Sequence, residues 1–375
     1  MEKPRAPLYY ADYIQVDRLL DCQQMESARH GRPAHDEMLF IIVHQAYELW
    51  FKQILWELDA VLAIFSGASV PEEAVGRAVS HCARIVEIQR VLIQQVDVLE
   101  TMTPLDFLDF RDDLIPASGL QSVQFRLIEN KLGMRREDRL QLHNAPYTSR
   151  FRKEDAARIE ASENEPSLFD RVEDWLERTP FLNFGDFDFW REYRRAVDAM
   201  LAADGESIRN NPTLNDEERA TQLAGLDATG RRFADVFESP PGAAAGEAGT
   251  PAGANPAAPG RHLSRRALQA ALLINLYRDE PILHLPFRLL ALLANIERNF
   301  TTWRQRHAQM AMRMIGTRIG TGGTSGHEYL DRAAERHKIF GDLLGLSSYF
   351  IPRSALPRLP QAVRGTMGFN FNPPR

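Results

Sequence analysis

The chain has 375 residues, of which 44% are hydrophobic and 26% charged, the ordinary composition of a globular protein that buries a large core. A formal net charge of −6, without a concentrated basic stretch, argues against a nucleic-acid-binding protein. Two cysteines without metal or haem-attachment spacing argue against a disulfide framework and favour the cytoplasm, and neither the amino terminus nor any apolar run fits a signal peptide or a membrane span.

Apolar residues recur at helical spacing along the chain, whereas the alternating pattern of strands is nearly absent. The clearest helix covers residues 36–65, with Asp36 as its N-cap, and it is apolar on almost every side, as expected inside a bundle. Further helices are predicted at 74–101, 104–114, 120–132, 168–205 with a break near Pro180, 213–237, 262–278 and about 286–316. The sequence therefore predicts an all-α helical bundle.

The stretch "SPPGAAAGEAGTPAGANPAAPG" at 239–260 interrupts this pattern. Ala, Gly and Pro make up 18 of its 22 residues, so it has too little apolar surface to offset the entropy of ordering. We expect a flexible, disordered surface insertion. Because similar helices flank it, we interpret residues 1–375 as a single all-helical domain.

Two histidines on apolar helical faces could serve a buried cofactor. His44 lies in "LFIIVHQAYELWF", and His307 shares a face with Trp303, Met310 and Met314. A histidine in such a place is more often a core residue with a hydrogen-bond partner, but His307 also suits a single axial haem ligand. Without a CxxCH stretch, such a haem would be held non-covalently.

A non-haem iron site is an alternative near the start of the first long helix. His30, His35, Glu37 and His44 offer the two histidines and one carboxylate of a facial triad. The signal is weak, because a spacing of two between His35 and Glu37 brings side chains together on a strand and separates them on a helix. The segment itself reads as the start of a helix.

The glycine-rich stretch "MIGTRIGTGGTSGHEYL" at 314–330 follows a predicted helix. It fits neither the dinucleotide fingerprint, which needs a preceding strand, nor a phosphate loop with GK[ST]. Its backbone N–H groups and the hydroxyls of Thr321, Thr324 and Ser325 could bind a carboxylate, an ammonium group or a propionate. The simpler reading is a mobile helix end capped at Gly316.

A further candidate is Arg111, close in sequence to Phe107 and Leu114. An arginine beside aromatic rings can bind a carboxylate through two parallel hydrogen bonds. An ion pair with a neighbour such as Asp112 is the simpler expectation. Together with the turn at Ser118, these residue types suit an aromatic amino acid beside a haem.

Long, collinear stretches of the chain resemble the tryptophan 2,3-dioxygenase family. They are "DEMLFIIVHQAYELWFKQILWELDAV", "FRDDLIPASGLQSVQFRLIENKLG", "LYRDEPILHLPFRLLALLANIERNFTTWRQRHAQMAMRMIGTRIGTGGTSGHEYL" and "YFIPRSALP". The resemblance implies an all-helical, homotetrameric, cytoplasmic enzyme of the kynurenine pathway with one haem b per subunit. Such an enzyme inserts both atoms of O₂ across the indole C2–C3 bond of L-tryptophan and yields N-formyl-L-kynurenine.

The same resemblance implies roles for the residues around the cofactor. His307 would be the axial ligand of the haem iron, and Ser118 and Gly119 would lie at the edge of the haem pocket. His44 would be the catalytic histidine on the opposite side, where it would accept a hydrogen bond from the indole N–H. Because the indole nitrogen can keep its proton, we do not expect His44 to be an obligatory base.

The resemblance also implies a substrate site made of five further residues. Phe40 and Phe107 would flank the indole ring, with Leu114 nearby. Arg111 would pair with the substrate carboxylate. Thr321 in the glycine-rich stretch would contact the amino-acid end.

The N-terminal segment 1–24 matches a family segment that reaches into a neighbouring subunit. Tyr10 and Tyr13 would thereby contribute to the substrate site of that subunit. A few positions depart from the family pattern without removing a chemical group that the reaction needs: Ala11, Leu120 and Thr324. Two other classes of function stay open from the residues alone, a non-catalytic haem-binding sensor and a helical interaction module.

Overall fold

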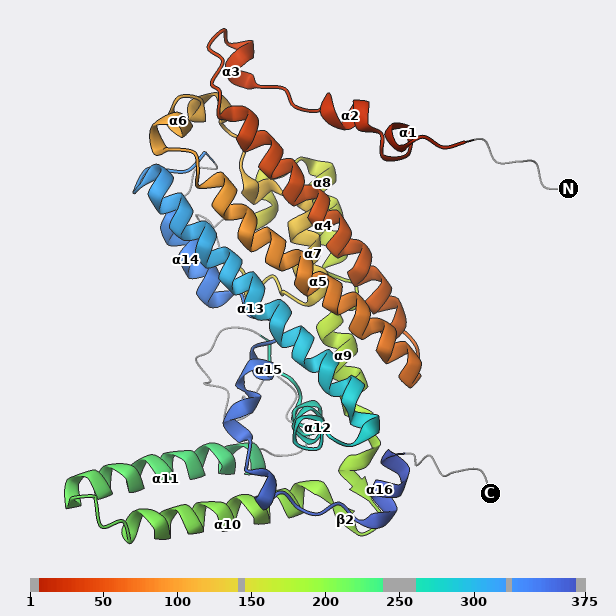
Figure 1. Cartoon of the computed structure of the whole chain (residues 1–375), viewed down its shortest axis with the longest axis vertical. Helices are drawn as coiled ribbons and strands as arrows, with labels where there is room; N and C mark the ends of the chain where they lie inside the picture. The colour runs from red at the N-terminus through yellow and green to blue at the C-terminus, as the bar shows by residue number, and fades with distance from the viewer. Residues whose placement is uncertain (1–6, 141–145, 239–260, 322–325, 369–375) are drawn as a thin grey trace, which may run out of the picture.

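A computed structural model describes residues 7–140, 146–238, 261–321 and 326–368 of the chain (Figure 1). Helices form almost all of this part, and the described strands are one antiparallel pair in which Asn183 faces Asp188. The predicted all-α class is therefore confirmed. The predicted insertion at 239–260 lies outside the described residues, as do Thr324 and Ser325.

The α-helices and strands, in chain order, are α1 Tyr10–Ile14, α2 Val16–Leu20, α3 Glu26–Arg29, α4 Glu37–Phe65, α5 Glu72–Leu99, α6 Pro104–Leu108, α7 Val123–Leu132, α8 Lys153–Ser162, α9 Leu168–Glu177, β1 Asn183–Phe184, β2 Phe187–Asp188, α10 Phe189–Arg209, α11 Asp216–Glu238, α12 Arg265–Leu276, α13 Pro281–Ile315, α14 Gly326–Arg336, α15 Gly341–Gly345 and α16 Gln361–Met367. Short 3₁₀ turns join them: η1 Arg111–Leu114, η2 Gly119–Gln121, η3 Tyr147–Arg150, η4 Pro180–Leu182, η5 Leu346–Tyr349 and η6 Arg353–Ala355. No described helix is long and apolar enough to cross a membrane.

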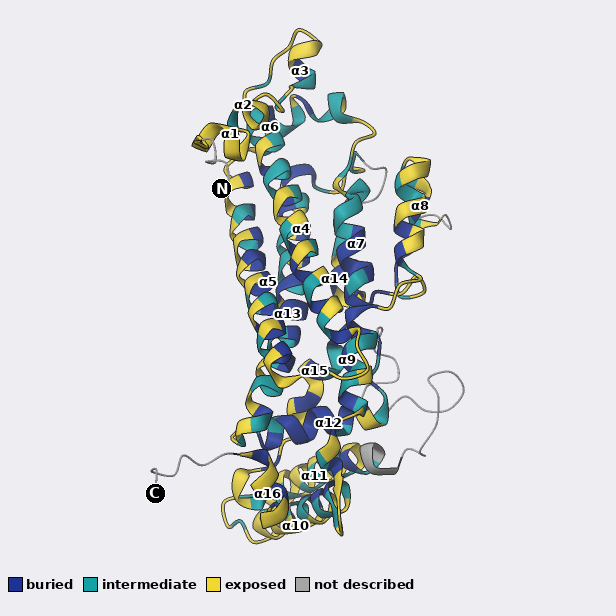
Figure 2. Cartoon of the chain, turned by 90° about the vertical axis from the view of Figure 1, so that its right-hand side faces the viewer, coloured by how far each residue is buried: buried dark blue, intermediate teal, exposed yellow. Residues whose placement is uncertain are grey.

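Three long helices, α4, α5 and α13, lie side by side and form the body of the bundle (Figures 1 and 2). Helix α7 packs against α4, and α14 packs against α13. Near the N-terminal end of α13, α12 runs across the direction of the long helices, and the hairpin of α10 and α11 lies beyond it. A continuous apolar core runs through both parts, so the long helices are held over their full length.

Most predicted helices agree with the structure within a few residues, but the predicted helix 104–114 is divided into α6 and η1, and α8 and α14 were not predicted. Proline explains two features of the rest. The stretch 168–205 is broken around Pro180 as expected, with η4 and the strand pair in the gap. Helix α13 begins five residues before Pro286, because Pro281 takes the first helical position, where its missing N–H costs nothing. Gly316 does cap the helix, at a φ of 59° that favours glycine.

The expectation that the first long helix lies wholly inside a bundle is wrong for a single chain. Helix α4 starts at Glu37, and Asp36 precedes it without making a side-chain cap hydrogen bond. Its outer side leaves an apolar stripe in contact with solvent: Ile42, Leu49, Trp50 and Trp56, the last 74% exposed. A contiguous apolar surface of this kind is typical of a protein–protein interface.

Candidate active site

A cavity of about 300 Å³ opens between α4, α13, α14 and the turns around η1 and η2. This is within the size range of small-molecule sites. It brings together most of the site residues proposed from the sequence: Phe40, His44, Phe107, Arg111, Ser118, Gly119, His307 and Thr321. These residues come from six separate segments of the chain, so their convergence is a property of the tertiary fold.

Three of the proposed residues lie elsewhere. Leu114 is in η1 but packs against the hydrophobic core instead of lining the cavity. Tyr10 and Tyr13 are on α1, where they are 76% and 72% exposed. Figure 1 shows α1 and α2 projecting away from the bundle, so neither tyrosine approaches the cavity of its own chain.

His44 presents an acceptor nitrogen to the cavity. Its Nδ1 lies 2.7 Å from the carbonyl oxygen of Phe40, one turn earlier in α4. A carbonyl can only accept, so Nδ1 carries the proton and Nε2 is left as an acceptor. Burial lowers the pKa of His44, and the bond to Phe40 only partly opposes this. The imidazole is therefore neutral at pH 7.

His307 enters the same cavity from α13. Its ring stacks on Trp303, with 5.7 Å between ring centroids, and it makes no hydrogen bond within the described part of the chain. Burial, and then the nearby His44, lower the pKa of His307 to about 4. Histidine binds a metal as the neutral imidazole, and both ring nitrogens of His307 are free of protein hydrogen bonds within the described residues.

Phe40 and Phe107 lie together on one side of the cavity. Their ring centroids are 5.6 Å apart with 29° between the planes, and Phe110 meets both rings nearly edge-on. Rings at this distance touch each other, and a third ring inserted between them would need a separation of about 7 Å. At the observed separation, a flat ligand would pack against the two rings and not between them.

Arg111 is hydrogen-bonded to protein groups through both terminal nitrogens, but its Nε has no partner. Its Nη1 donates to Asp112, 2.9 Å away, and its Nη2 donates to the carbonyl of Ile319. Its buried Nε has no hydrogen-bond partner. The simpler expectation of a pair with Asp112 is thus confirmed, but Asp112 is 81% exposed. Such an exposed ion pair contributes little stability and can be exchanged for a ligand carboxylate.

The turn beside the cavity is fixed by its own side chains. The hydroxyl oxygen of Ser118 accepts a hydrogen bond from the N–H of Leu120, and Gln121 accepts one from the Ser118 N–H. The hydroxyl proton of Ser118 therefore remains available to a ligand. A Cβ added to Gly119 would meet no atom within 4 Å, so the backbone there is open.

The non-haem iron alternative receives no support. Glu37 accepts hydrogen bonds from the N–H groups of Glu26 and Ser27, which fixes its carboxylate as a local cap. His30 faces Asp113. Within the described ranges, no group of three or more His, Cys, Asp or Glu side chains could hold a metal ion.

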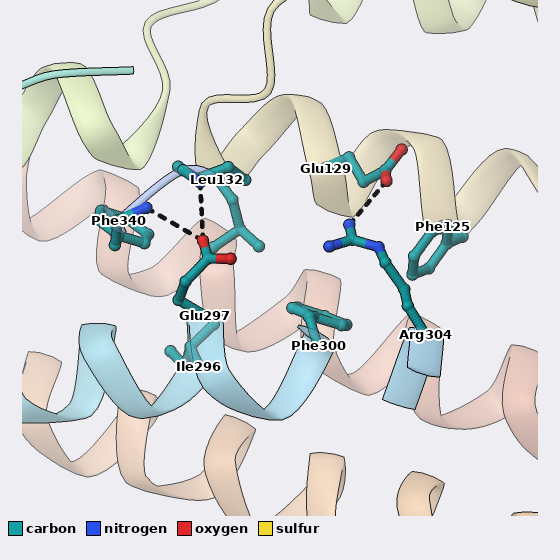
Figure 3. A pocket seen from close by; sticks show the side chains of 9 residues that line it. Phe125, Glu129, Leu132, Ile296, Glu297, Phe300, Arg304 and Phe340 are labelled. Carbon is teal, nitrogen blue, oxygen red and sulfur yellow. Dashed lines mark hydrogen bonds and ion pairs between the residues drawn. The ribbon is translucent and has the colours of Figure 1, made fainter. Parts of the chain in front are cut away.

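Sequence reasoning missed the inner wall of the cavity, which is built from three buried charged residues and one buried histidine. They are Arg126, Glu129, Arg304 and His337. The available signal was the presence of charged residues within apolar helical stretches, as in "QFRLIENKL". Figure 3 shows Glu129 paired with Arg304, and Glu297 facing the backbone of Phe340.

Comparison with known proteins identifies the family of the chain. A family model described as tryptophan 2,3-dioxygenase matches residues 2–350. The chain is 50% identical to the tryptophan 2,3-dioxygenase of Bdellovibrio bacteriovorus over 97% of its length and 99% of the relative's. It is 43% identical to that of Alteromonas mediterranea, with 98% and 99% covered, and 45% identical to that of Dictyostelium discoideum, with 97% and 89% covered. The chain belongs to the tryptophan 2,3-dioxygenase family.

Proposed function

We propose that this protein uses haem b, one per subunit, to insert O₂ across the indole C2–C3 bond of L-tryptophan and form N-formyl-L-kynurenine. The observation that carries the proposal is a single cavity, in a chain of this family, into which α4 and α13 bring two neutral imidazoles. A haem-binding sensor or a colourless interaction module would not need the arrangement of acceptor, cation and aromatic rings described above.

The residues of the cavity fit a haem. His307 offers an imidazole without a protein partner, and large apolar side chains surround it: Trp303, Met310, Met314 and Ile315. His307 would hold the haem iron as its side-chain ligand from the protein. Haem would supply the redox-active iron that activates O₂; the protein would supply orientation and polarity. Ser118 and Gly119 would border its edge.

The remaining residues would bind and orient the substrate. Nε2 of His44 would accept a hydrogen bond from the indole N–H, against the rings of Phe40 and Phe107. Arg111 would exchange its exposed partner Asp112 for the substrate carboxylate. Thr321 would contact the amino-acid end. Each of these steps binds or aligns the substrate, and His44 does not have to remove a proton.

We also propose a cytoplasmic homotetramer built from one domain per chain, residues 1–375. The outer stripe of α4, which includes Leu49 and Trp56, is an apolar surface that a second copy would cover. The segment 1–24 would reach the cavity of a neighbouring subunit through Tyr10 and Tyr13, which are exposed in the single chain. The free cysteines Cys22 and Cys82 are consistent with a reducing compartment.

One experiment separates the candidate functions. The protein is purified with haemin, its Soret absorbance is recorded, and L-tryptophan is added with ascorbate while the ultraviolet absorbance of N-formylkynurenine is followed. We expect a Soret band and product formation. A folded protein that stays colourless with haemin would overturn the haem assignment, and a haem-loaded protein that forms no product would be a sensor.

A further inference from the structure

Glu129 lies at the centre of a buried, mostly charged cluster that forms part of the inner wall of the cavity. Its side chain on α7 is 2% exposed and pairs with Arg126 at 2.7 Å, with Arg139, and with Arg304 at 3.0 Å. The Nδ1 of His337 lies 3.7 Å from the same carboxylate. We call these residues the Glu129 cluster.

The cluster joins four parts of the chain that are distant in sequence. Arg304 is on α13, and it donates both to Glu129 and, at 3.1 Å, to the carbonyl of His337, directly after α14. The Nε2 of His337 accepts a hydrogen bond from the N–H of Leu140 at 3.3 Å, so its proton sits on Nδ1, which faces Glu129. One carboxylate therefore ties α7, α13, α14 and the turn before residue 141 together.

The position of Arg304 links the cluster to the proposed cofactor. Arg304 comes three residues before His307, about one turn and about 4.5 Å along the helix axis. Arg304, Arg126 and His337 also line the cavity itself. A change in Glu129 would therefore alter the cavity wall, because the side chains that pair with Glu129 also line the cavity.

Glu129 is ionised, although it is fully buried. Burial by itself would raise its pKa, but the charges of Arg139 and Arg126, the hydrogen bond with His337 and the charge of Arg304 hold the pKa well below the ordinary value. Without this carboxylate the guanidinium groups would face one another in a medium that solvates charge poorly. The arrangement of the guanidinium groups in the cluster is therefore stable only while the Glu129 carboxylate is present.

The chain contains a matched carboxylate away from the cavity. Glu57 on α4 is also 2% exposed at its side chain, and it pairs with His81 and with Arg84 at 2.8 Å. It follows His44 by 13 residues, about 20 Å along the same helix, and it does not line the cavity. Glu57 and Glu129 are both buried, ion-paired carboxylates, but Glu57 lies away from the cavity and its partners His81 and Arg84 are more exposed.

We propose that Glu129 is a positioning residue of the haem pocket. It fixes Arg304 and His337, holds α14 against α13 beside His307, and places a negative charge behind the cofactor. This inference rests on the proposed function, because the cofactor is taken to be haem. It predicts that loss of the Glu129 charge changes the properties of the bound haem, whereas loss of the Glu57 charge does not.

The test compares Glu129→Gln and Glu57→Gln with the parent protein, all loaded with haemin. In Glu129→Gln we expect a higher midpoint potential of the iron, because removal of a nearby negative charge favours the less positive ferrous state. We also expect several-fold faster transfer of haemin to apomyoglobin and, in the haem-free protein, faster amide hydrogen exchange in α14. Glu57→Gln should lose stability while its potential and haemin release stay at the parent values.

An unchanged potential and unchanged haemin release in Glu129→Gln would overturn the inference, as would equal shifts in Glu57→Gln. If Glu129→Gln does not fold, Arg304→Lys replaces it. That variant keeps the positive charge and loses the forked contacts, so we expect faster haemin release at the parent potential, and unchanged release would overturn the inference. Failure of the proposed function is a separate result, since the parent protein itself would then take up no haemin.

Discussion

The two sides of the cavity differ in how far their main polar side chains are hydrogen-bonded to the protein. On the ligand side, Nε of Arg111 has no hydrogen-bond partner and His307 makes no hydrogen bond within the described residues. On the inner side, Glu129 is surrounded by three arginines and His337. Buried polar groups are normally satisfied, so an imidazole and a guanidinium nitrogen left over at the cavity indicate where a ligand binds. The Glu129 carboxylate, which has four side-chain partners, belongs to the support that holds the site, although the buried Nε of Arg139 in the same cluster has no hydrogen-bond partner. The predictions below test this division, starting with the largest effect.

The strongest test of the ligand side is His307→Ala. If His307 is the only axial ligand from the protein, the variant should lose its haem or its activity altogether, and free imidazole should restore part of the haem binding. The Soret absorbance of the purified protein measures this. His284→Ala, at an exposed position of the same helix, is the control and should keep its haem. Full haem content and full activity in His307→Ala would reject the assignment.

The strongest test of the inner side is the stability of Glu129→Gln. Breaking a buried ion pair costs about 3–5 kcal/mol. The pKa of Glu129 is lower in the folded protein than in the unfolded chain, so its stabilising effect is complete above the unfolded value near pH ~4.5 and is lost as the pH falls below it.

The free energy of unfolding in urea, measured from pH ~7 to pH ~3, follows this loss. Glu129→Gln should be less stable than the parent at neutral pH and should depend less steeply on pH in the acid range. Equal slopes for the two proteins would mean that the carboxylate is already protonated in the fold, which contradicts the ion pairs.

Arg111→Ala tests whether the guanidinium on the ligand side binds the substrate carboxylate. A charge-assisted hydrogen bond contributes about 1.5–3 kcal/mol, so KM for L-tryptophan should rise about 10- to 150-fold with a smaller change in kcat. Binding of L-tryptophanamide, which has no carboxylate, should weaken much less, as measured by the change that it causes in the haem spectrum. An unchanged KM would remove Arg111 from the substrate site.

His44→Ala should have a moderate effect. One neutral hydrogen bond contributes about 0.5–1.5 kcal/mol, which corresponds to a rate about 2- to 13-fold lower. The rate of N-formylkynurenine formation at saturating L-tryptophan is the measurement. Complete loss of activity with normal substrate binding would show that His44 is an obligatory base after all.

The smallest effect concerns the exposed partner of Arg111. An ion pair of this kind contributes about 0–1 kcal/mol, so Asp112→Asn should lower KM at most about fivefold by releasing the guanidinium for the substrate. Asp109→Asn, at a nearby exposed position, removes the same charge outside this pair and serves as the control. A higher KM in Asp112→Asn would mean that Asp112 aligns Arg111 and does not compete with the substrate.

The sequence by itself determined the helices and the family. Apolar spacing defines a helix and the face that it buries, and this was enough to find α4, α5 and α13 within a few residues. Long collinear stretches around His44, Arg111 and His307 carried the resemblance. The apolar outer side of α4 was misread as buried, because periodicity counts apolar residues and does not tell whether the chain itself or another copy covers them.

Only the tertiary structure decided which helical faces meet. Arg304 and Glu129 are 175 residues apart, and Arg111 and Ile319 are 208 apart, so neither contact has a local signature. The same holds for the exclusion of Leu114 from the cavity and for the mutual contact of Phe40 and Phe107. Local patterns are set by the backbone geometry of one helix, whereas a buried charge is stable only where the whole fold brings its partners to it.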